Sequence, residues 1–343
     1  YLQTKIEYAF DRAVNNVDFL PSAISRSGGP SSQYRMDMSN STLFLKLVGT
    51  SRWLGDFTVY TSADWRGSGL GLKLQNAYLS TKYFTVGYGI GTFMDINAIP
   101  TTIDYGGPCG MTFYRSTQLQ LRYGFDFGLS MGIAVEAPDV NATGNETVSI
   151  GAQRCPNVPM FVQYCWRNDI NNHVRIGAIM RDISYTDKLK GIDTDKVGWG
   201  VQASALVTMG KFQLKGQFTA GEGIGSLVNN ISNIGVDVVP DPQSPGRAML
   251  LTSESWYAGL QYNFNSKWLA SAAFSQTALF SRNGYSAAHP EQFRKGQYAV
   301  ANVFYNVSNN LQVGIEYLHG WRHDFDGRTS NANRVNLSAR YDF

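Results

Sequence analysis

The sequence predicts an all-β protein: a transmembrane antiparallel β-barrel of about sixteen strands, with short turns at one end and long loops at the other. Three observations predict it. Segments of about ten residues with alternating apolar and polar side chains recur along all 343 residues, turn residues separate them, and every second connection is short. Because strand side chains alternate between the two faces of a sheet, each such segment has one apolar face and one polar face.

The final segment illustrates the alternation. Leu337, Tyr341 and Phe343 point to one side, whereas Arg340 and Asp342 point to the other. We predict sixteen strands, at residues 1–10, 41–51, 56–67, 70–80, 84–95, 115–125, 127–137, 159–169, 173–185, 196–210, 211–223, 254–265, 267–280, 296–308, 310–325 and 328–343.

The connections between these strands alternate in length. Every second link is a turn of a few residues, and the links between these turns are mostly long, such as residues 11–40, 138–158 and 222–253. Short periplasmic turns and long extracellular loops are typical of bacterial outer-membrane barrels. An unpaired strand edge cannot persist in hydrocarbon, so we expect the last strand to pair with the first and residues 1–343 to form a single domain.

Composition and barrel size indicate what surrounds the apolar face. Only 16% of residues are charged, and no apolar run reaches the ~18 residues of a membrane helix. Sixteen strands enclose a lumen too wide for side chains to fill, so we expect a wet interior and an apolar face against lipid. Aromatic residues at strand ends, such as Trp268 and Tyr341, match the interfacial girdles of such barrels. We therefore expect an outer-membrane location, with the lipid bilayer and its lipopolysaccharide as partners.

The polar face of the predicted strands is mostly basic. Its anions are Glu7, Asp64, Glu136, Glu316 and Asp342, and its cations are Lys5, Lys46, Arg66, Lys73, Arg122, Arg167, Arg175, Arg181, Lys215, Arg334 and Arg340. A lumen lined mostly by one sign of charge concentrates ions of the opposite sign, and rings of Arg and Lys select anions. The alternative is that many of these cations pair across the wall, as Lys5 could with Glu7 and Arg340 with Asp342.

Height along the strands indicates which cations lie nearest the middle of the membrane. At ~3.3 Å per residue, Lys46, Arg181, Lys215 and Arg334 are expected near mid-membrane, and Arg122, Arg175 and Arg340 nearer the periplasmic mouth. Arg115 begins the strand after a long loop. That position favours a side chain that points toward the loop. The strand alternation, however, places Arg115 on the same face as Thr117 and Leu119, which argues against this direction.

Two stretches carry a resemblance to a known family. Residues 64–80 and 87–110 are similar to the DcaP-type dicarboxylate porins, which have an Arg-bearing strand, an L-x-L-x-x-A-Y strand and a loop of the form P-x-T-x-D-[FY]-x-G-P-x-G in that order. Residues 314–343 resemble the last hairpin of that family. The loop motif is the most specific part of the resemblance.

The resemblance implies a homotrimeric, sixteen-stranded porin for small anionic solutes such as dicarboxylates. Its third loop, carried over to residues 96–113, would fold inward and constrict the channel, with Asp104 and Tyr105 at its core. Gly106, Gly107 and Pro108 would form the tight bend.

The sequence leaves other functions open. The alternatives are a general or sugar-preferring porin, with Tyr105 along the path, and a non-conducting adhesin or structural barrel. No enzyme, cofactor or metal site is predicted: the i, i+4 spacing of His319 and His323 separates them too widely on a strand. The net charge of +3 and scattered basic residues also argue against nucleic-acid binding. A Cys109–Cys155 bridge and free thiols both stay open.

Overall fold

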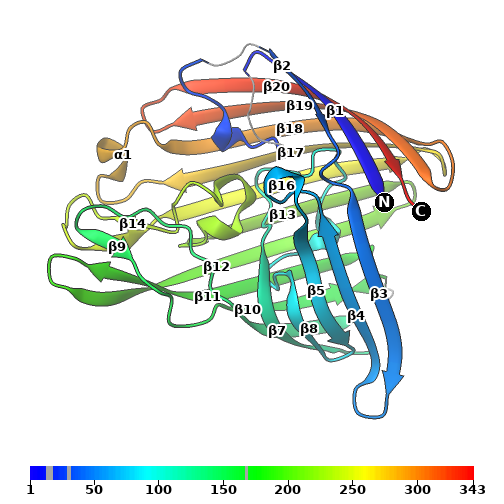
Figure 1. Cartoon of the computed structure of the whole chain (residues 1–343), viewed down its shortest axis with the longest axis horizontal. Helices are drawn as coiled ribbons and strands as arrows, with labels where there is room; N and C mark the ends of the chain where they lie inside the picture. The colour runs from blue at the N-terminus through cyan, green and yellow to red at the C-terminus, as the bar shows by residue number, and fades with distance from the viewer. Residues whose placement is uncertain (13–17, 29–31, 167–168) are drawn as a thin grey trace.

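Antiparallel strands form nearly all of the regular structure, and 18 of them belong to one sheet that curls into a barrel-like wall (Figure 1). The computed structural model describes residues 1–12, 18–28, 32–166 and 169–343. The principal strands are β1 (Leu2–Phe10), β2 (Ser32–Asp37), β3 (Thr42–Ser51), β4 (Gly55–Asp64), β5 (Lys73–Thr81), β6 (Phe84–Ile90), β7 (Arg115–Gly124), β8 (Leu129–Glu136), β10 (Val158–Cys165), β11 (His173–Asp187), β12 (Ile192–Met209), β13 (Phe212–Glu222), β16 (Thr252–Asn263), β17 (Trp268–Phe280), β18 (Phe293–Asn306), β19 (Leu311–Asp324) and β20 (Thr329–Tyr341).

Short elements lie in the longer connections. These are the strands β9 (Val148–Ile150), β14 (Val238–Pro240) and β15 (Ala248–Leu250), the helix α1 (Tyr285–Ala288), and the 3-10 turns η1 (Pro21–Ala23), η2 (Ser68–Leu70), η3 (Ile96–Ala98), η5 (Gly225–Leu227) and η6 (Asn229–Ile231). None of the helices among the described residues is long and apolar enough to cross a membrane.

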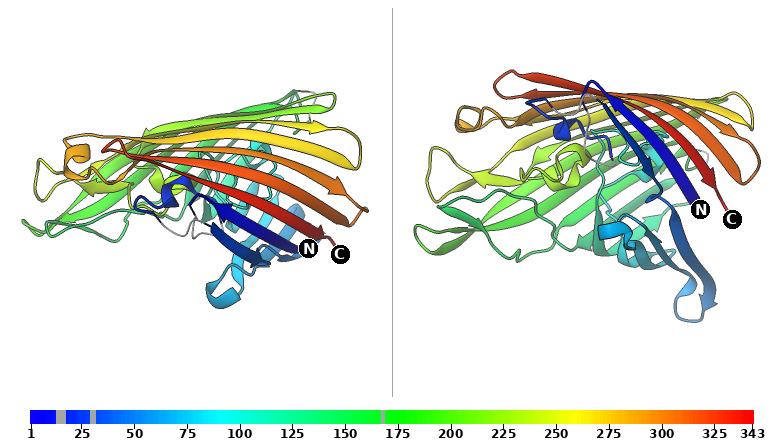
Figure 2. Two further views of the ribbon diagram at one scale, coloured as in Figure 1. Left: turned by 90° about the horizontal axis from the view of Figure 1, so that it is seen from above. Right: turned by 45° about the horizontal axis from the view of Figure 1, so that its top comes forward.

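The first and last long strands pair with each other. The register of β1 with β20 runs from Leu2↔Tyr341 to Phe10↔Asn333 without a break. The two ends of the chain therefore lie side by side, as both views in Figure 2 show. The predicted pairing of the last strand with the first is confirmed.

The prediction that residues 11–40 form one loop was wrong in part. Residues 32–37 form β2, which pairs with β1. The short segment 38–41 then leads into β3, where Tyr1 and Thr42 exchange backbone hydrogen bonds of 2.9 and 3.1 Å. Because β2 has only six residues and a Ser-Asn-Ser break follows it, its alternation is too short to detect in the sequence.

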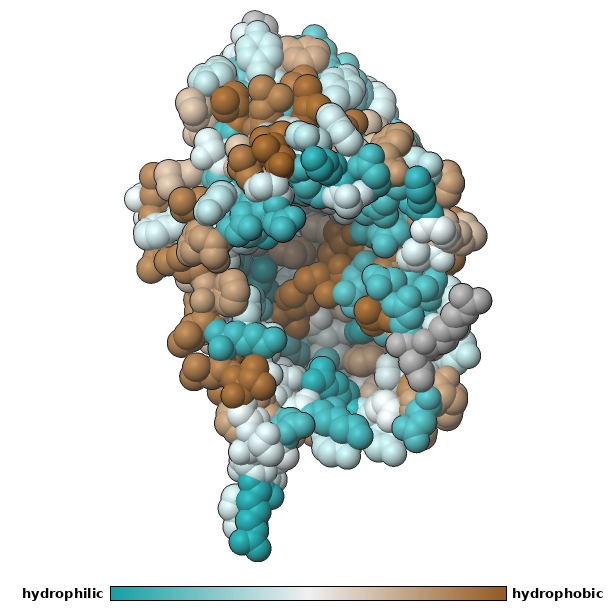
Figure 3. Space-filling model, turned by 90° about the vertical axis from the view of Figure 1, so that its right-hand side faces the viewer, coloured by the Kyte–Doolittle hydropathy of each residue, from teal (hydrophilic) through white to brown (hydrophobic). Residues whose placement is uncertain are grey.

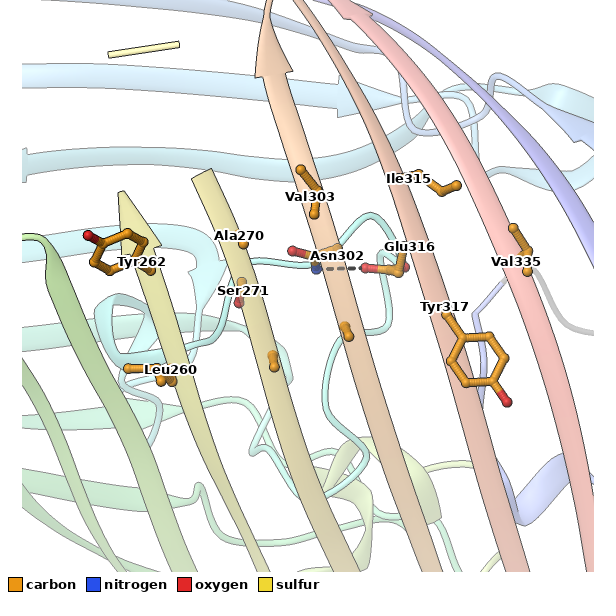
Figure 4. A pocket seen from close by; sticks show the side chains of 12 residues that line it. Leu260, Tyr262, Ala270, Ser271, Asn302, Val303, Ile315, Glu316, Tyr317 and Val335 are labelled. Carbon is orange, nitrogen blue, oxygen red and sulfur yellow. Dashed lines mark hydrogen bonds between the residues drawn. The ribbon is translucent and has the colours of Figure 1, made fainter. Parts of the chain in front are cut away.

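The wall separates an apolar outer face from a polar inner face. On β19, Ile315 is 52% exposed on the outer face, whereas the neighbouring Glu316 is 1% exposed on the inner face. Figure 4 shows the same division on β18, where Asn302 is hydrogen-bonded to Glu316 and the next residue, Val303, lies at an outer groove of about 530 Å³. The period of two predicted from the sequence therefore sets the two faces.

The interior is narrowed by three connections that fold inward. Residues 18–28, 91–114 and 223–237 pack against the inner face and form buried apolar clusters there. One cluster joins Phe19 and Cys109 to wall residues such as Tyr298. These segments therefore fill part of the interior that the sequence predicted to be open, and the space that they leave is visible as the hollow in Figure 3.

A charge on the outer face tests whether that face meets lipid. We expect Leu337→Arg to cost about 2–4 kcal/mol of folding stability in a bilayer, because its guanidinium would lie against hydrocarbon. Ser338→Arg is the matched control, since Ser338 lines the interior cavity at nearly the same height. Equal unfolding midpoints for the two variants in lipid vesicles would contradict the assignment of the faces.

Candidate pore constriction

The segment between β6 and β7, residues 91–114, leaves the wall and crosses the interior; we call it the third loop. It begins earlier than the predicted residues 96–113, because β6 ends at Ile90. The N–H of Thr92 donates to the Glu136 carboxylate at 2.6 Å rather than to a neighbouring strand. This side-chain acceptor on β8 turns the chain inward.

Glu316 on β19 fastens the middle of the third loop to the wall. Its carboxylate accepts the backbone N–H groups of Ile103 (2.6 Å) and Asp104 (2.7 Å). The Asn302 amide donates both to Glu316 (3.0 Å) and to the carbonyl of Thr101 (2.9 Å). Charge-assisted hydrogen bonds of this kind are stronger than neutral ones, so they hold backbone that no sheet supports.

Asp104 connects the third loop to the first connection and to the basic wall. Its Oδ1 accepts the N–H of Phe19 at 3.1 Å and lies 4.0 Å from Arg334. Arg334 also contacts Glu7 at 3.5 Å, and Lys5 contacts Glu7 at 2.5 Å. Burial raises the pKa of Asp104 to about 7, although the positive charge of Lys5 opposes this shift.

The beginning of the third loop has a second anchor. The carboxylate of Asp95 accepts a hydrogen bond from Ser204 (2.6 Å) and lies 2.9 Å from Nε2 of His173. All three side chains are buried. The loop is thus attached to β11 and β12 on one side of the interior and to β18 and β19 on the other.

Glycines allow the loop to bend and to approach the wall. Gly107 has φ +63°, which favours glycine, and its N–H donates to the carbonyl of Asp104. Gly110 lies so close to the backbone of β16 that a Cβ atom would come within 2.4 Å of the Trp256 carbonyl oxygen. The predicted bend at residues 106–108 is therefore followed by a close contact at Gly110 that the motif alone did not explain.

Arg66 lies beside the third loop, between an aromatic ring and a carboxylate. Its guanidinium carbon is 4.1 Å from the ring centroid of Tyr105. Its Nη2 is 2.5 Å from Oδ2 of Asp18, in the first connection. Stacking and ion pairing together orient this guanidinium, as is common for Arg at anion-binding positions.

The third loop borders an interior cavity of about 530 Å³ toward the end that holds the termini. Asp104, Tyr105, Arg115 and Arg340 line it. Arg115 stacks on Phe113 at 5.1 Å, and its Nε has no hydrogen-bond partner within the described chain. The structure thus brings four of the predicted site residues to one cavity, and it places Arg115 at the loop despite its strand parity.

Several other predicted cations lie apart from that cavity. Lys46 on β3 and Lys73 on β5 are exposed, and Arg122 on β7 donates to the carbonyl of Thr81 at 2.6 Å. Lys215 on β13 is in register with Gly259, against which Pro100 of the third loop packs. In the described part of the chain, none of these four has a carboxylate within 4.0 Å.

Other predicted cations are already ion-paired. Arg181 is 2% exposed, so its side chain does not line open lumen in this structure. It contacts Asp237 at 3.2 Å and donates to the backbone carbonyl oxygens of Gly223 and Asp139. Its charge is therefore used to join the connection after β8 to the connection after β13. Lys5 with Glu7 and Arg340 with Asp342 (2.8 Å) form the local pairs that sequence spacing suggested. Arg167 lies outside the described residues.

Sequence reasoning missed the acidic and aromatic residues of the first connection. Asp18 and Phe19 fall between strands, where no periodicity assigns a face, so nothing indicated that they enter the interior. Asp95 was assigned to a strand, and His173 gave no signal as its partner. An isolated Asp-Phe pair in a long loop is too common in sequences to identify such an anchor.

The three cysteines are free thiols: Cys109 is buried, Cys155 exposed and Cys165 partly buried. The open question of a Cys109–Cys155 bridge is thus answered for this structure. Within the described ranges, no group of three or more His, Cys, Asp or Glu side chains could hold a metal ion.

A barrel-like wall with an inward loop, as follows β6 here, is the fold of bacterial outer-membrane channels and porins. Among solved structures, the chain is similar to the outer membrane channel DcaP of Acinetobacter baumannii, with a TM-score of 0.86 and 19% identity over 100% of this chain and 96% of that one. The predicted resemblance is confirmed at the level of the fold.

Two further porins share the fold more distantly. The anion-selective porin of Comamonas acidovorans has a TM-score of 0.58 and 14% identity, covering 100% of this chain and 97% of that one. OprB of Pseudomonas putida has a TM-score of 0.62 and 12% identity, covering 100% and 93%. The sequence itself matches no known family model and no curated protein.

Removing the Glu316 carboxylate should loosen the third loop. Glu316→Ala leaves the buried N–H groups of Ile103 and Asp104 unpaired, at a cost of roughly 1–3 kcal/mol each. We expect the amide hydrogens of these two residues to exchange at least about fivefold faster, measured by hydrogen exchange in detergent or nanodiscs.

Glu254→Ala provides the control, because Glu254 is exposed on β16. Unchanged exchange at Ile103 and Asp104 in Glu316→Ala would show that the loop does not depend on this anchor.

Proposed function

We propose that this chain is a porin of the bacterial outer membrane, through which small hydrophilic solutes diffuse passively, with a preference for anions such as dicarboxylates. In this proposal residues 1–343 form a single domain, and the third loop constricts its channel. The single observation that carries the proposal is the third loop itself, which is anchored inside the wall and borders a cavity lined by Arg115 and Arg340.

We propose a closed barrel of sixteen strands. Counting β2, residues 38–41 and β3 as one interrupted strand gives sixteen among the principal strands. Support for closure comes from the register of β1 with β20, of β1 with β2 and of β3 with β4. The hydrogen bonds of Tyr1 to Thr42 and of Trp65 to Ser39 span the interruption on both sides.

The proposed anion preference rests on which cations solutes can reach. Arg115 and Arg340 line the cavity, and Arg66 stacks on Tyr105 of the third loop, which also lines it. Lys215 lies apart from the cavity, in register with Gly259, against which Pro100 of the third loop packs. The interior carboxylates of Glu136 and Glu316, by contrast, are each saturated by hydrogen bonds from the loop they anchor. A positive field in a narrow, low-dielectric passage raises the local concentration of anions.

The proposed partners follow from the fold and the family resemblance. The exposed apolar face would contact bilayer lipid and lipopolysaccharide, and the chain would assemble as a homotrimer, as the resemblance to DcaP-type porins implies. Small anionic solutes would be the preferred ligands of the channel, and transport would need no cofactor.

A sugar-preferring channel is the second candidate. It is favoured by the aromatic rings of Tyr105 and Phe113, which lie edge to face at 6.3 Å and both border the cavity. Sugars bind such rings through their apolar faces. Competition between a sugar and a dicarboxylate for the conducting path would distinguish the two candidates.

Ion selectivity in a planar bilayer tests the proposal. We expect a reversal potential of the sign for anion preference in a potassium chloride gradient, and a shift of at least several millivolts toward cations in Lys215→Glu. Lys267→Glu serves as the control, because Lys267 lies in the short turn between β16 and β17.

Cation preference of the unmodified protein would overturn the anion proposal, and absence of conductance would overturn the porin proposal. Arg181→Glu is unsuitable as a selectivity probe, because it would break the buried pair with Asp237. That pair helps to join the connection after β8 to the connection after β13.

A further inference from the structure

We propose that Asp18 is a built-in competitor at the solute path: its carboxylate occupies an anion site formed by Arg66 and Tyr105, and a permeating carboxylate displaces it. This inference rests on the proposed anion-preferring channel and assigns a regulatory, specificity-determining role to a residue of the first connection. The exchange involves no covalent step, because one carboxylate replaces another on the same guanidinium.

The Arg66–Asp18 contact resembles a bound ligand more than a structural ion pair. Only Oδ2 of Asp18 contacts the guanidinium, at 2.5 Å, although a guanidinium can bind a carboxylate through two parallel hydrogen bonds. The other oxygen, Oδ1, is buried and has no hydrogen-bond partner in the part of the chain that the structure describes. The pair therefore lacks the second of the two parallel hydrogen bonds, which a better-placed carboxylate can form.

Exposure separates this pair from the structural pairs of the interior. The side chains of Arg66 and Asp18 are 18% and 23% exposed, whereas those of Arg181 and Asp237 are both 0% exposed. An ion pair that water reaches loses less when it separates than a fully buried pair, whose charges would stay desolvated and unpaired. The carboxylate of Asp18 can thus leave Arg66 without disturbing the fold, whereas that of Asp237 cannot leave Arg181.

The backbone at Asp18 is held by contacts that do not involve Arg66. The N–H of the next residue, Phe19, donates to Asp104, and the Phe19 ring is buried against Tyr298 at 6.0 Å. Ser22 donates through its N–H and its hydroxyl to Asn230, at 2.9 and 2.5 Å. Displacement therefore requires only a rotation of the Asp18 side chain, with the segment remaining in place.

The third loop is shaped to admit this carboxylate. A Cβ atom on Gly106 would lie 2.8 Å from Cβ of Asp18, so only glycine there lets Asp18 come this close. The neighbouring Tyr105 carries the guanidinium on one face and borders the interior cavity. The site is thus next to the cavity that the third loop borders.

The expected consequence is a selective reduction in affinity. While Asp18 occupies Arg66, only the remaining fraction of channels offers a free guanidinium, so the apparent dissociation constant of an anionic solute rises by the inverse of that fraction. A neutral solute does not compete for Arg66 and is unaffected. Asp18 would therefore keep carboxylate binding weak enough for release.

A double-mutant cycle tests this competition. Succinate half-saturation is measured in planar bilayers for the unmodified protein, Asp18→Asn, Arg66→Gln and the double variant. We expect Asp18→Asn to lower the half-saturating succinate concentration by up to about fivefold, and to have no effect when Arg66→Gln is present. Asp326→Asn is the matched control, because Asp326 pairs with Arg26 at 2.7 Å away from the third loop.

Two outcomes would overturn the inference. An unchanged half-saturation in Asp18→Asn means that Asp18 does not compete, and an equal decrease with and without Arg66 means that Asp18 acts only as a diffuse negative charge. Both outcomes are distinct from failure of the proposed function, which appears in the unmodified protein as cation preference or absent conductance. Circular dichroism of each variant confirms that the barrel has formed.

Discussion

The structure depends on one constraint: the backbone N–H and C=O groups of a wall placed in hydrocarbon must all be paired within the wall. The register of β1 with β20 joins the two ends of the chain. The interruption between β2 and β3 is the exception that tests this rule. There the Ser41 hydroxyl accepts the N–H of Gln3, the Asp37 carboxylate accepts the N–H of Ser39, and the amino group of Tyr1 donates to the carbonyl of Thr42. Polar side chains thus complete the ladder where alternation fails.

The interior obeys a second rule, because connections that enter it bring backbone groups without strand partners. Carboxylates satisfy them. On the inner wall, Glu136 accepts from Thr92, and Glu316 accepts from Ile103 and Asp104. Within the connection after β13, Asp237 accepts from Asn141 and Ser226. Burying a carboxylate is unfavourable unless it is hydrogen-bonded, and each of these is. Many of the acidic residues inside the barrel-like wall are therefore explained by their role in holding the inward connections, without reference to a solute.

The sequence predicted the wall well and the interior poorly, for a physical reason. Strand alternation is local, so the faces of segments such as 311–324 follow from spacing alone. Whether a connection folds into the interior depends on contacts between residues far apart in the sequence, such as Phe19 with Asp104 and His173 with Asp95. The third loop was the exception, because a motif with Asp104 and Gly107 marks it. Lys215 and Arg181 show the limit: both lie on the inner face, but only a structure reveals that Asp237 neutralises Arg181.

Counting cations on the polar face therefore overstates the field that a solute experiences. The interior pairs form a series of increasing exposure, from Arg181–Asp237 at 0% through Arg66–Asp18 at about a fifth to Arg340–Asp342 at about a half. A fully buried pair is part of the scaffold, and a widely exposed pair is already weakened by water. Pairs between these limits are ordered enough to present a defined site and weak enough to exchange their carboxylate. In the proposed channel, selectivity would therefore depend on how far each guanidinium is shielded by its own carboxylate, and less on the total charge.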